Sequence, residues 1–123
     1  MATKHIQAWT VVIDQWHPTP LNRLLSCHWA TRAKRKRIDY KVIADYCGFC
    51  GVTTATGRRR VYLSLIMAPK QRSPDPDSLW KVVLDGLVKC GALRNDSHLW
   101  CELMPVLFLR GATKQTRIGI EDI

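Results

Sequence analysis

The sequence is poor in acidic residues and contains no long apolar run and no repeated or low-complexity segment. No apolar stretch reaches the roughly 18 residues that a membrane-spanning helix requires, so we expect no membrane association. Residues 1–16 include Asp14 and lack a small-residue cleavage site, which argues against a secretory signal peptide. From these absences we expect a cytoplasmic protein. The 123 residues suit one domain, 1–123, with a modest core.

The five cysteines are an odd number in a chain without a secretion signal, so we expect reduced thiols rather than a disulfide framework. Cys47 and Cys50 have the spacing of half a zinc site, but a second such pair is missing. His98 and Cys101 are three residues apart in a predicted strand and would point to opposite faces. A small interaction domain held together by zinc is therefore the interpretation that we favour least.

Acidic residues number 10 against 19 Lys and Arg, which gives a formal net charge of +9. Residues 23–72 hold twelve of these basic residues and only two aspartates, so the excess lies in that half. The positive electrostatic potential of such a segment favours nucleic acid or another anionic surface as the partner. The run 34–37 would alone be an ordinary solvated helix face, but in so basic a chain we favour phosphate contacts. The predicted contacts are Arg32, Lys34, Arg35, Lys36, Arg37, Arg58, Arg59, Arg60, Lys70 and Arg72.

Four of the ten acidic residues fall in one segment, residues 74–100. The prolines on either side of Asp75 favour an extended backbone there. Asp77 or Ser78 is a suitable N-cap for a helix that reaches about Cys90. Apolar residues recur at helical spacing through this helix and predict one buried face. The first two aspartates of the segment therefore flank the start of a helix.

These carboxylates form a candidate metal site. Asp75 and Asp77 would lie at the helix N-terminus, where anions are favoured. Asp96 falls in the turn after the helix, and a strand from about His98 would return it toward the helix start if that strand lies beside the preceding one. Three carboxylates would then converge, with Lys81 one turn along, and such hard oxygen ligands suit Mg²⁺. The simpler interpretation makes the aspartates caps and turn residues, and Asp77–Lys81 a surface pair.

The pattern D-x-D-x-x-x-K-x-x-x-D, followed by a turn aspartate, resembles the RusA family of Holliday-junction resolvases. The resemblance implies that Asp75, Asp77 and Asp96 bind the catalytic metal, Mg²⁺ with Mn²⁺ as a substitute. It implies that Lys81 is needed for cleavage. The matching residues are Asp75, Asp77, Lys81, Leu84, Asp85, Leu87, Asp96 and Ser97.

The activity implied by this resemblance is that of an endodeoxyribonuclease in DNA recombination and repair. It would resolve four-way junctions by paired symmetric nicks that leave 5′-phosphates. The expected partners are branched DNA and a second copy of the chain in a homodimer, because two symmetric cuts need two related active sites. No nucleotide cofactor is expected. A non-catalytic protein that binds branched or duplex DNA is the alternative, with the acidic cluster serving only the fold.

Two positions depart from the family pattern. Ser78 stands where the family usually has Asn, and Asn95 stands where it often has an acidic residue. Neither departure removes a predicted ligand. The proline-containing segment 17–23 also resembles a family loop near the active site, although His17 on its own is more simply part of a rigid loop. The resemblance is specific only within residues 74–100.

The hydrophobic pattern predicts an α+β fold in the order β-α-β-α-β-β, with about four strands in a mixed sheet and two main helices on one face. Residues 61–67 are almost continuously apolar, which predicts a strand buried on both faces. Pro105 predicts an edge or a bulge within the strand 98–109. The remaining expected elements are a strand at 6–14, a helix at 26–47 that could contain a break, a hairpin loop at 110–114 and a strand at 115–120.

Overall fold

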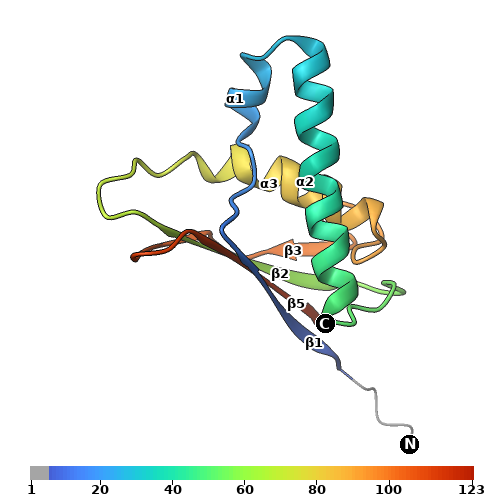
Figure 1. The fold of residues 1–123 in the computed structure, drawn as a ribbon. Coiled ribbons are helices and arrows are strands. Elements are labelled where there is room, and N and C mark those ends of the chain that lie inside the picture. The colour runs from blue at the N-terminus through green and yellow to red at the C-terminus, as the bar shows by residue number, and fades with distance from the viewer. Residues whose placement is uncertain (1–5) are drawn as a thin grey trace, which may run out of the picture.

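A mixed β-sheet forms one layer of the structure, and the helices lie on one of its faces (Figure 1). The computed structural model describes residues 6–123, so residues 1–5 of the predicted domain 1–123 lie outside the described residues. The predicted α+β class is confirmed, with one short helix and one strand more than expected. The elements are β1 (Ala8–Asp14), α1 (Leu21–Leu25), α2 (Trp29–Phe49), β2 (Arg59–Met67), α3 (Pro76–Lys89), β3 (Cys101–Leu103), β4 (Leu107–Arg110) and β5 (Gln115–Asp122).

β2 lies at the centre of the sheet, whose order is β1-β5-β2-β3 with β4 also paired to β2. β5 pairs antiparallel with β1 and β2, whereas β3 and β4 pair parallel with β2. Pro105 lies between β3 and β4, so the predicted interruption at this proline is confirmed. The predicted hairpin at 110–114 is wrong, because β4 and β5 lie on opposite sides of β2 and do not pair.

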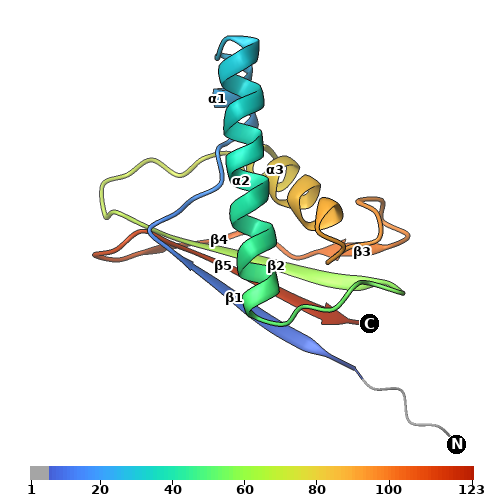
Figure 2. The same cartoon turned by 45° about the vertical axis from the view of Figure 1, so that its right-hand side comes forward.

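The helices of residues 6–123 all cover the same face of the sheet (Figure 2). In β2 the burial alternates, with every second residue from Arg59 to Met67 buried and the residues between them half-buried or exposed. The predicted burial of this strand on both faces is therefore wrong, whereas the placement of the helices on one face is confirmed. The covered face carries the core, to which β1 and β5 contribute Val11, Ile13, Ile118 and Ile120.

α3 packs closely against α2 on the covered face of the sheet. Its buried residues recur at helical spacing and include Leu79, Val83 and Leu87, as the sequence predicted. A Cβ atom added at Gly86 would lie 2.6 Å from Cδ1 of Ile43 on α2, so this glycine permits the close approach of the two helices. α3 is thereby fixed in place, and so is its N-terminus, which carries Asp75 and Asp77.

The N-terminal half of α2 and the short helix α1 project beyond the sheet as a helical arm (Figures 1 and 2). We call residues 21–38 the α1–α2 arm. The predicted helix 26–47 begins three residues later than expected, at Trp29, and continues without interruption to Phe49. Ile43 and Cys47 on this helix are buried, whereas Trp29 at its start is exposed. The described part of the chain has no helix that is both long and apolar enough to span a membrane.

Candidate functional site

Asp75 and Asp77 lie together at the N-terminus of α3. Asp75 has an extended backbone and is the N-cap, with its Oδ1 accepting a hydrogen bond from the backbone N–H of Asp77 at 3.1 Å. The cap thus precedes both predicted positions, Asp77 and Ser78, because Pro76 occupies the first helical turn, where its missing N–H costs no hydrogen bond. Both side chains are exposed, and neither forms a salt bridge within residues 6–123.

Lys81 follows one turn along α3, but its ammonium group pairs with Asp85 and not with Asp77. The Nζ–Oδ1 distance is 3.4 Å, and the lysine side chain remains half-exposed. Asp85 also accepts a hydrogen bond from the hydroxyl of Tyr40 at 3.2 Å. Burial, and secondarily the Asp85 carboxylate, raise the pKa of Tyr40 to about 12. Asp85 therefore links α3 to α2, which accounts for its presence without a role as a ligand.

Asp96 lies apart from Asp75 and Asp77 in this chain. It lines a smaller hollow with Asp85, Lys89 and Asn95, beside the later turns of α3. The cause is the parallel pairing of β2 and β3. The start of β3 lies beside the start of β2, whereas Asp75 follows the end of β2. A 14-residue helix, about 20 Å long, separates the two ends. The expected return of Asp96 to the start of the helix is therefore wrong within one chain.

The carboxylates of one chain fit a bound Mg²⁺ only in part. Within residues 6–123 no group of three or more His, Cys, Asp or Glu side chains is placed to hold a metal ion. Asp75 and Asp77 alone fit the ion's chemistry, because Mg²⁺ commonly takes one or two carboxylates and fills its shell with water and phosphate oxygens. One chain thus offers a two-carboxylate site and leaves Asp96 outside it.

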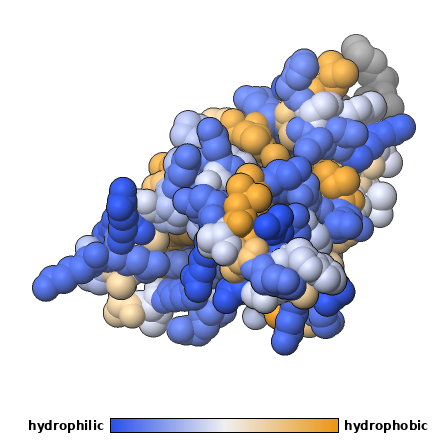
Figure 3. All heavy atoms as spheres, turned by 90° about the horizontal axis from the view of Figure 1, so that it is seen from above, coloured by the Kyte–Doolittle hydropathy of each residue, from blue (hydrophilic) through white to orange (hydrophobic). Residues whose placement is uncertain are grey.

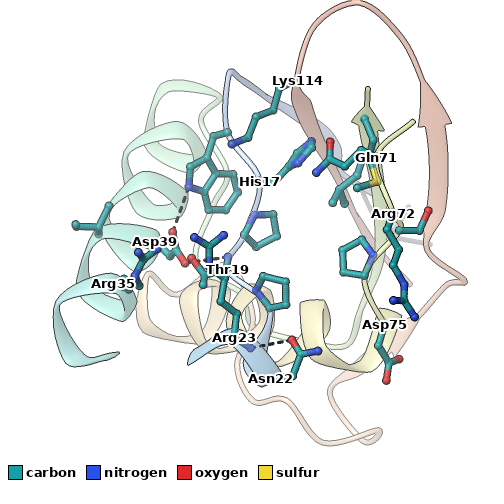
Figure 4. Close-up of a pocket in the computed structure, with 18 residues that line it drawn as sticks. His17, Thr19, Asn22, Arg23, Arg35, Asp39, Gln71, Arg72, Asp75 and Lys114 are labelled. Atoms are coloured by element: carbon teal, nitrogen blue, oxygen red, sulfur yellow. Dashed lines mark hydrogen bonds between the residues drawn. The ribbon is translucent and has the colours of Figure 1, made fainter. Parts of the chain in front are cut away.

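Asp75 stands at the rim of a hollow of ≈ 850 Å³ that lies between the β1–α1 connection, the α1–α2 arm and the β2–α3 loop (Figure 4). The lining is mostly polar, and basic side chains face it from three segments. Asp39, one of its two acidic residues, is buried and hydrogen-bonded, which leaves Asp75 as the exposed carboxylate. The charged lining residues are Arg23, Arg35, Asp39, Arg72, Asp75 and Lys114.

The wall formed by the β1–α1 connection is held by Asp39 of α2, which is 4% exposed. Its carboxylate accepts from Nε1 of Trp16 at 3.2 Å and from the backbone N–H of Thr19 at 3.1 Å. Nε2 of His17 is hydrogen-bonded to the carbonyl of Ile66 at 2.8 Å. Burial, with a contribution from Lys114, lowers the pKa of His17. His17 is therefore a neutral imidazole that fixes the loop to β2, which agrees with the simpler interpretation of this residue as part of a rigid loop.

The opposite wall is the β2–α3 loop, and Arg110 holds it. The guanidinium of Arg110 donates to the carbonyl oxygens of Ala68 and Gln71 and to Oγ of Ser73, the last at 2.9 Å. Three anchoring points along one loop fix the approach to Asp75. Sequence reasoning missed Arg110 because an arginine at the end of a strand gives no local signal of its partners.

The predicted DNA contacts fall into three groups, those engaged within the fold, those without a partner and an intermediate pair. The guanidinium of Arg32 donates to the carbonyl oxygens of Leu24, Leu25 and Cys27, so it caps α1. Arg59 is buried, and its prediction as a DNA contact is wrong for that reason. In contrast, six other basic side chains form no hydrogen bond or ion pair within residues 6–123. They are Lys34, Arg35, Lys36, Arg37, Lys70 and Arg72.

Arg58 and Arg60 form an intermediate case at the start of β2. Arg60 is bound to Glu121 at 2.9 Å and to Glu102 at 3.2 Å. Arg58 approaches Glu102 at 3.9 Å and donates to the carbonyl of His98. Because these carboxylates neutralise the cluster, it is a weaker candidate for phosphate contact than the α1–α2 arm.

Two cations of the hollow, Arg23 and Lys114, were not among the predicted contacts. Each is an isolated basic residue, Arg23 in a short helix and Lys114 in a loop. Neither belongs to a run of charge, and although Arg23 ends the proline-containing segment 17–23, its basic side chain was not singled out there. Only the fold brings them to the same hollow as Asp75 (Figure 4).

Comparison with known proteins assigns this chain to no family. No protein-family model matches the sequence, and no curated protein matches it. Among solved structures, the one described as "AaThiL complexed with AMPPCP and TMP" aligns with 10% sequence identity and a TM-score of 0.45. The alignment covers 94% of this chain and 31% of that one, so this chain spans about a third of that protein's length. Neither a family nor a function follows at this level of similarity.

Proposed function

We propose that the protein is a Mg²⁺-dependent endodeoxyribonuclease that cuts four-way DNA junctions, as its resemblance to the RusA family implies. The observation that carries the proposal is the pair Asp75 and Asp77. Both carboxylates are exposed at the N-terminus of α3, and Asp75 stands on the rim of a hollow whose other exposed charges are basic. A phosphodiester needs both features, because the carboxylates bind a cation and the basic side chains neutralise the DNA backbone.

Each residue has a distinct task in this proposal. Asp75 and Asp77 would hold Mg²⁺, which when bound polarises the scissile phosphate and lowers the pKa of an attacking water. Arg72, on the loop that leads to Asp75, neutralises an adjacent phosphate. Lys81 exchanges its exposed pairing with Asp85 for the negative charge that develops during cleavage. In-line displacement leaves a 5′-phosphate and a 3′-hydroxyl.

The proposed homodimer gives Asp96 a place in the site. Within one chain Asp96 is separated from Asp75 and Asp77 by the length of α3, although the motif includes all three. A symmetric pair supplies a second Asp96, and a site completed by the Asp96 of a second copy is compatible with the separation. Two such sites related by a two-fold axis match the symmetry of a four-way junction.

Coexpression of two inactive variants tests the shared site. In a heterodimer of Asp77→Asn and Asp96→Asn, a site shared between copies combines both defects in one centre and leaves the other centre intact. Single-nick activity should return. If each chain completes its own site, both centres stay defective and the heterodimer is inactive.

The activity itself is tested with an end-labelled synthetic four-way junction and a linear duplex of matched length. Paired nicks at symmetric positions are expected on the junction alone, with Mg²⁺ or Mn²⁺ and not with EDTA. The competing function is a binding protein whose aspartates are only caps and turn residues. The capping bond of Asp75 favours that interpretation, and tight junction binding without cleavage in either metal would establish it.

A further inference from the structure

An exposed tryptophan marks the tip of the α1–α2 arm. Trp29, the first residue of α2, is 72% exposed, and Leu25 at the end of α1 is 59% exposed. Tryptophan carries a large apolar ring, and neither α3 nor the sheet covers it. Seen from the side toward which the arm projects, the surface is largely hydrophilic, with single hydrophobic side chains set among the polar ones (Figure 3). Trp29 and Leu25 thus expose apolar side chains at the tip of a basic arm.

The tip is a rigid support for this ring. The imidazole of His28 lies 5.5 Å from the Trp29 ring, centroid to centroid, and its Nδ1 accepts from the backbone N–H of Ala30 as the N-cap of α2. Arg32 donates to the carbonyl oxygens of two α1 residues and of Cys27 just after α1, and so ties the two helices together. A ring held on a capped, cross-tied turn loses little conformational freedom when it binds.

Charge decides which partner this surface fits. Lys36 and Arg37 lie seven and eight residues after Trp29, so they share its side of the helix. With Lys34 and Arg35 they form four consecutive cations without an ion-pair partner in residues 6–123. Two copies of the arm would repel each other, because residues 21–38 include no acidic side chain. A polyanion with aromatic faces, which is nucleic acid, satisfies both the charges and the ring.

We propose that Trp29 stacks on an unpaired or unstacked nucleobase of branched or single-stranded DNA while the adjacent cations of α2 hold the flanking phosphates. This inference rests on the DNA binding of the proposed function, and it adds the residue that distinguishes opened strands from continuous duplex. Every base offers a ring face, so the contact selects structure and not sequence. In a closed duplex the bases are stacked on one another, and Trp29 has nothing to bind.

The test measures binding in EDTA with the Asp77→Asn variant as parent, so that cleavage plays no part. Trp29→Ala should weaken binding to a four-way junction and to a single-stranded oligonucleotide by about 5- to 150-fold, the range of base–aromatic stacking. Binding to the linear duplex should change less than about two-fold. Trp29→Phe keeps a ring and should recover most of the affinity while removing part of the DNA-induced quenching of tryptophan fluorescence.

Phe49→Ala is the matched control, because Phe49 is 81% exposed on the same helix but lies at its other end. It should bind as the parent does. Equal binding by Trp29→Ala and the parent, or an equal loss on junction and duplex, would overturn the inference. So would a loss of self-association in Trp29→Ala without DNA. If Trp29-dependent binding is found and cleavage by the unmutated chain is not, only the nuclease proposal fails. Absence of all DNA binding defeats both.

Discussion

The guanidinium of Arg59 donates to the carboxylate of Asp122 at 2.8 Å, which joins the first residue of β2 to the last residue of β5. Arg59 is 2% exposed and also donates to the carbonyl oxygens of Thr53 and Ala92, at 2.7 and 2.9 Å. Its guanidinium lies 4.7 Å from the centre of the Trp9 ring. One side chain thus connects the strands β1, β2 and β5 with the loops that follow α2 and α3.

Replacement of Arg59 should therefore act on stability and not on DNA affinity. Arg59→Ala leaves the carboxylate and two carbonyl oxygens without their partner, and we expect a loss of about 3–5 kcal/mol in the free energy of unfolding. Urea denaturation followed by circular dichroism measures it. Arg58→Ala, an exposed neighbour, is the control and should change stability by less than about 0.5 kcal/mol. Similar stabilities for the two variants would refute the structural role of Arg59.

The buried carboxylate of Asp39 yields a second stability prediction. Asp39→Ala leaves the indole N–H of Trp16 and the backbone N–H of Thr19 without an acceptor. Each unsatisfied donor should lower the free energy of unfolding by about 1–3 kcal/mol. The released β1–α1 connection forms one wall of the hollow, so junction cleavage should fall as well. Thermal denaturation and the fluorescence of Trp16 report the change. Asp45→Ala, which breaks an exposed pair with Lys41, should leave both properties intact.

Neutralising the α1–α2 arm should weaken DNA binding without unfolding the protein. The triple variant Lys34→Ala, Lys36→Ala and Arg37→Ala removes three cations, and the slope of log K against log salt should become shallower by about 0.9 for each phosphate that these cations no longer neutralise. Filter binding between about 50 and 200 mM salt gives the slope. Arg32→Ala should behave differently, with reduced stability, because its guanidinium is engaged with α1. An unchanged salt slope in the triple variant would place the DNA elsewhere.

The thiols of Cys47 and Cys90 predict a pH dependence of chemical reactivity. The interaction between the two thiols raises the pKa of the buried Cys47 and lowers the pKa of Cys90. Since the thiolate is the nucleophile, Cys90 should react with iodoacetamide at a lower pH than a free cysteine does. Mass spectrometry of labelled peptides locates the reaction. Cys47→Ala removes this interaction and should shift the Cys90 profile to higher pH, and an unshifted profile would contradict this prediction.

The sequence predicted those features that depend on local pattern. The strand β1, the apolar stripe of α3 and the break at Pro105 each follow from the residues within one element. The position of Asp96 could not be predicted in this way, because it depends on whether the strand after α3 begins beside the start or the end of β2. Nor could the burial of Arg59, whose partners Thr53, Ala92 and Asp122 lie in three other parts of the chain.

The most direct test of the proposed nuclease uses a supercoiled plasmid with an extruded cruciform, incubated with Mg²⁺ and the unmutated protein, Asp77→Asn or Asp85→Asn. Asp77 is a proposed ligand, whereas Asp85 on the same helix is engaged by Tyr40 and Lys81. The unmutated protein and Asp85→Asn should both convert the plasmid to linear DNA by paired cuts. Asp77→Asn should still bind the cruciform but leave the plasmid supercoiled. Linear product from Asp77→Asn, or an intact plasmid with the unmutated protein, would contradict the account.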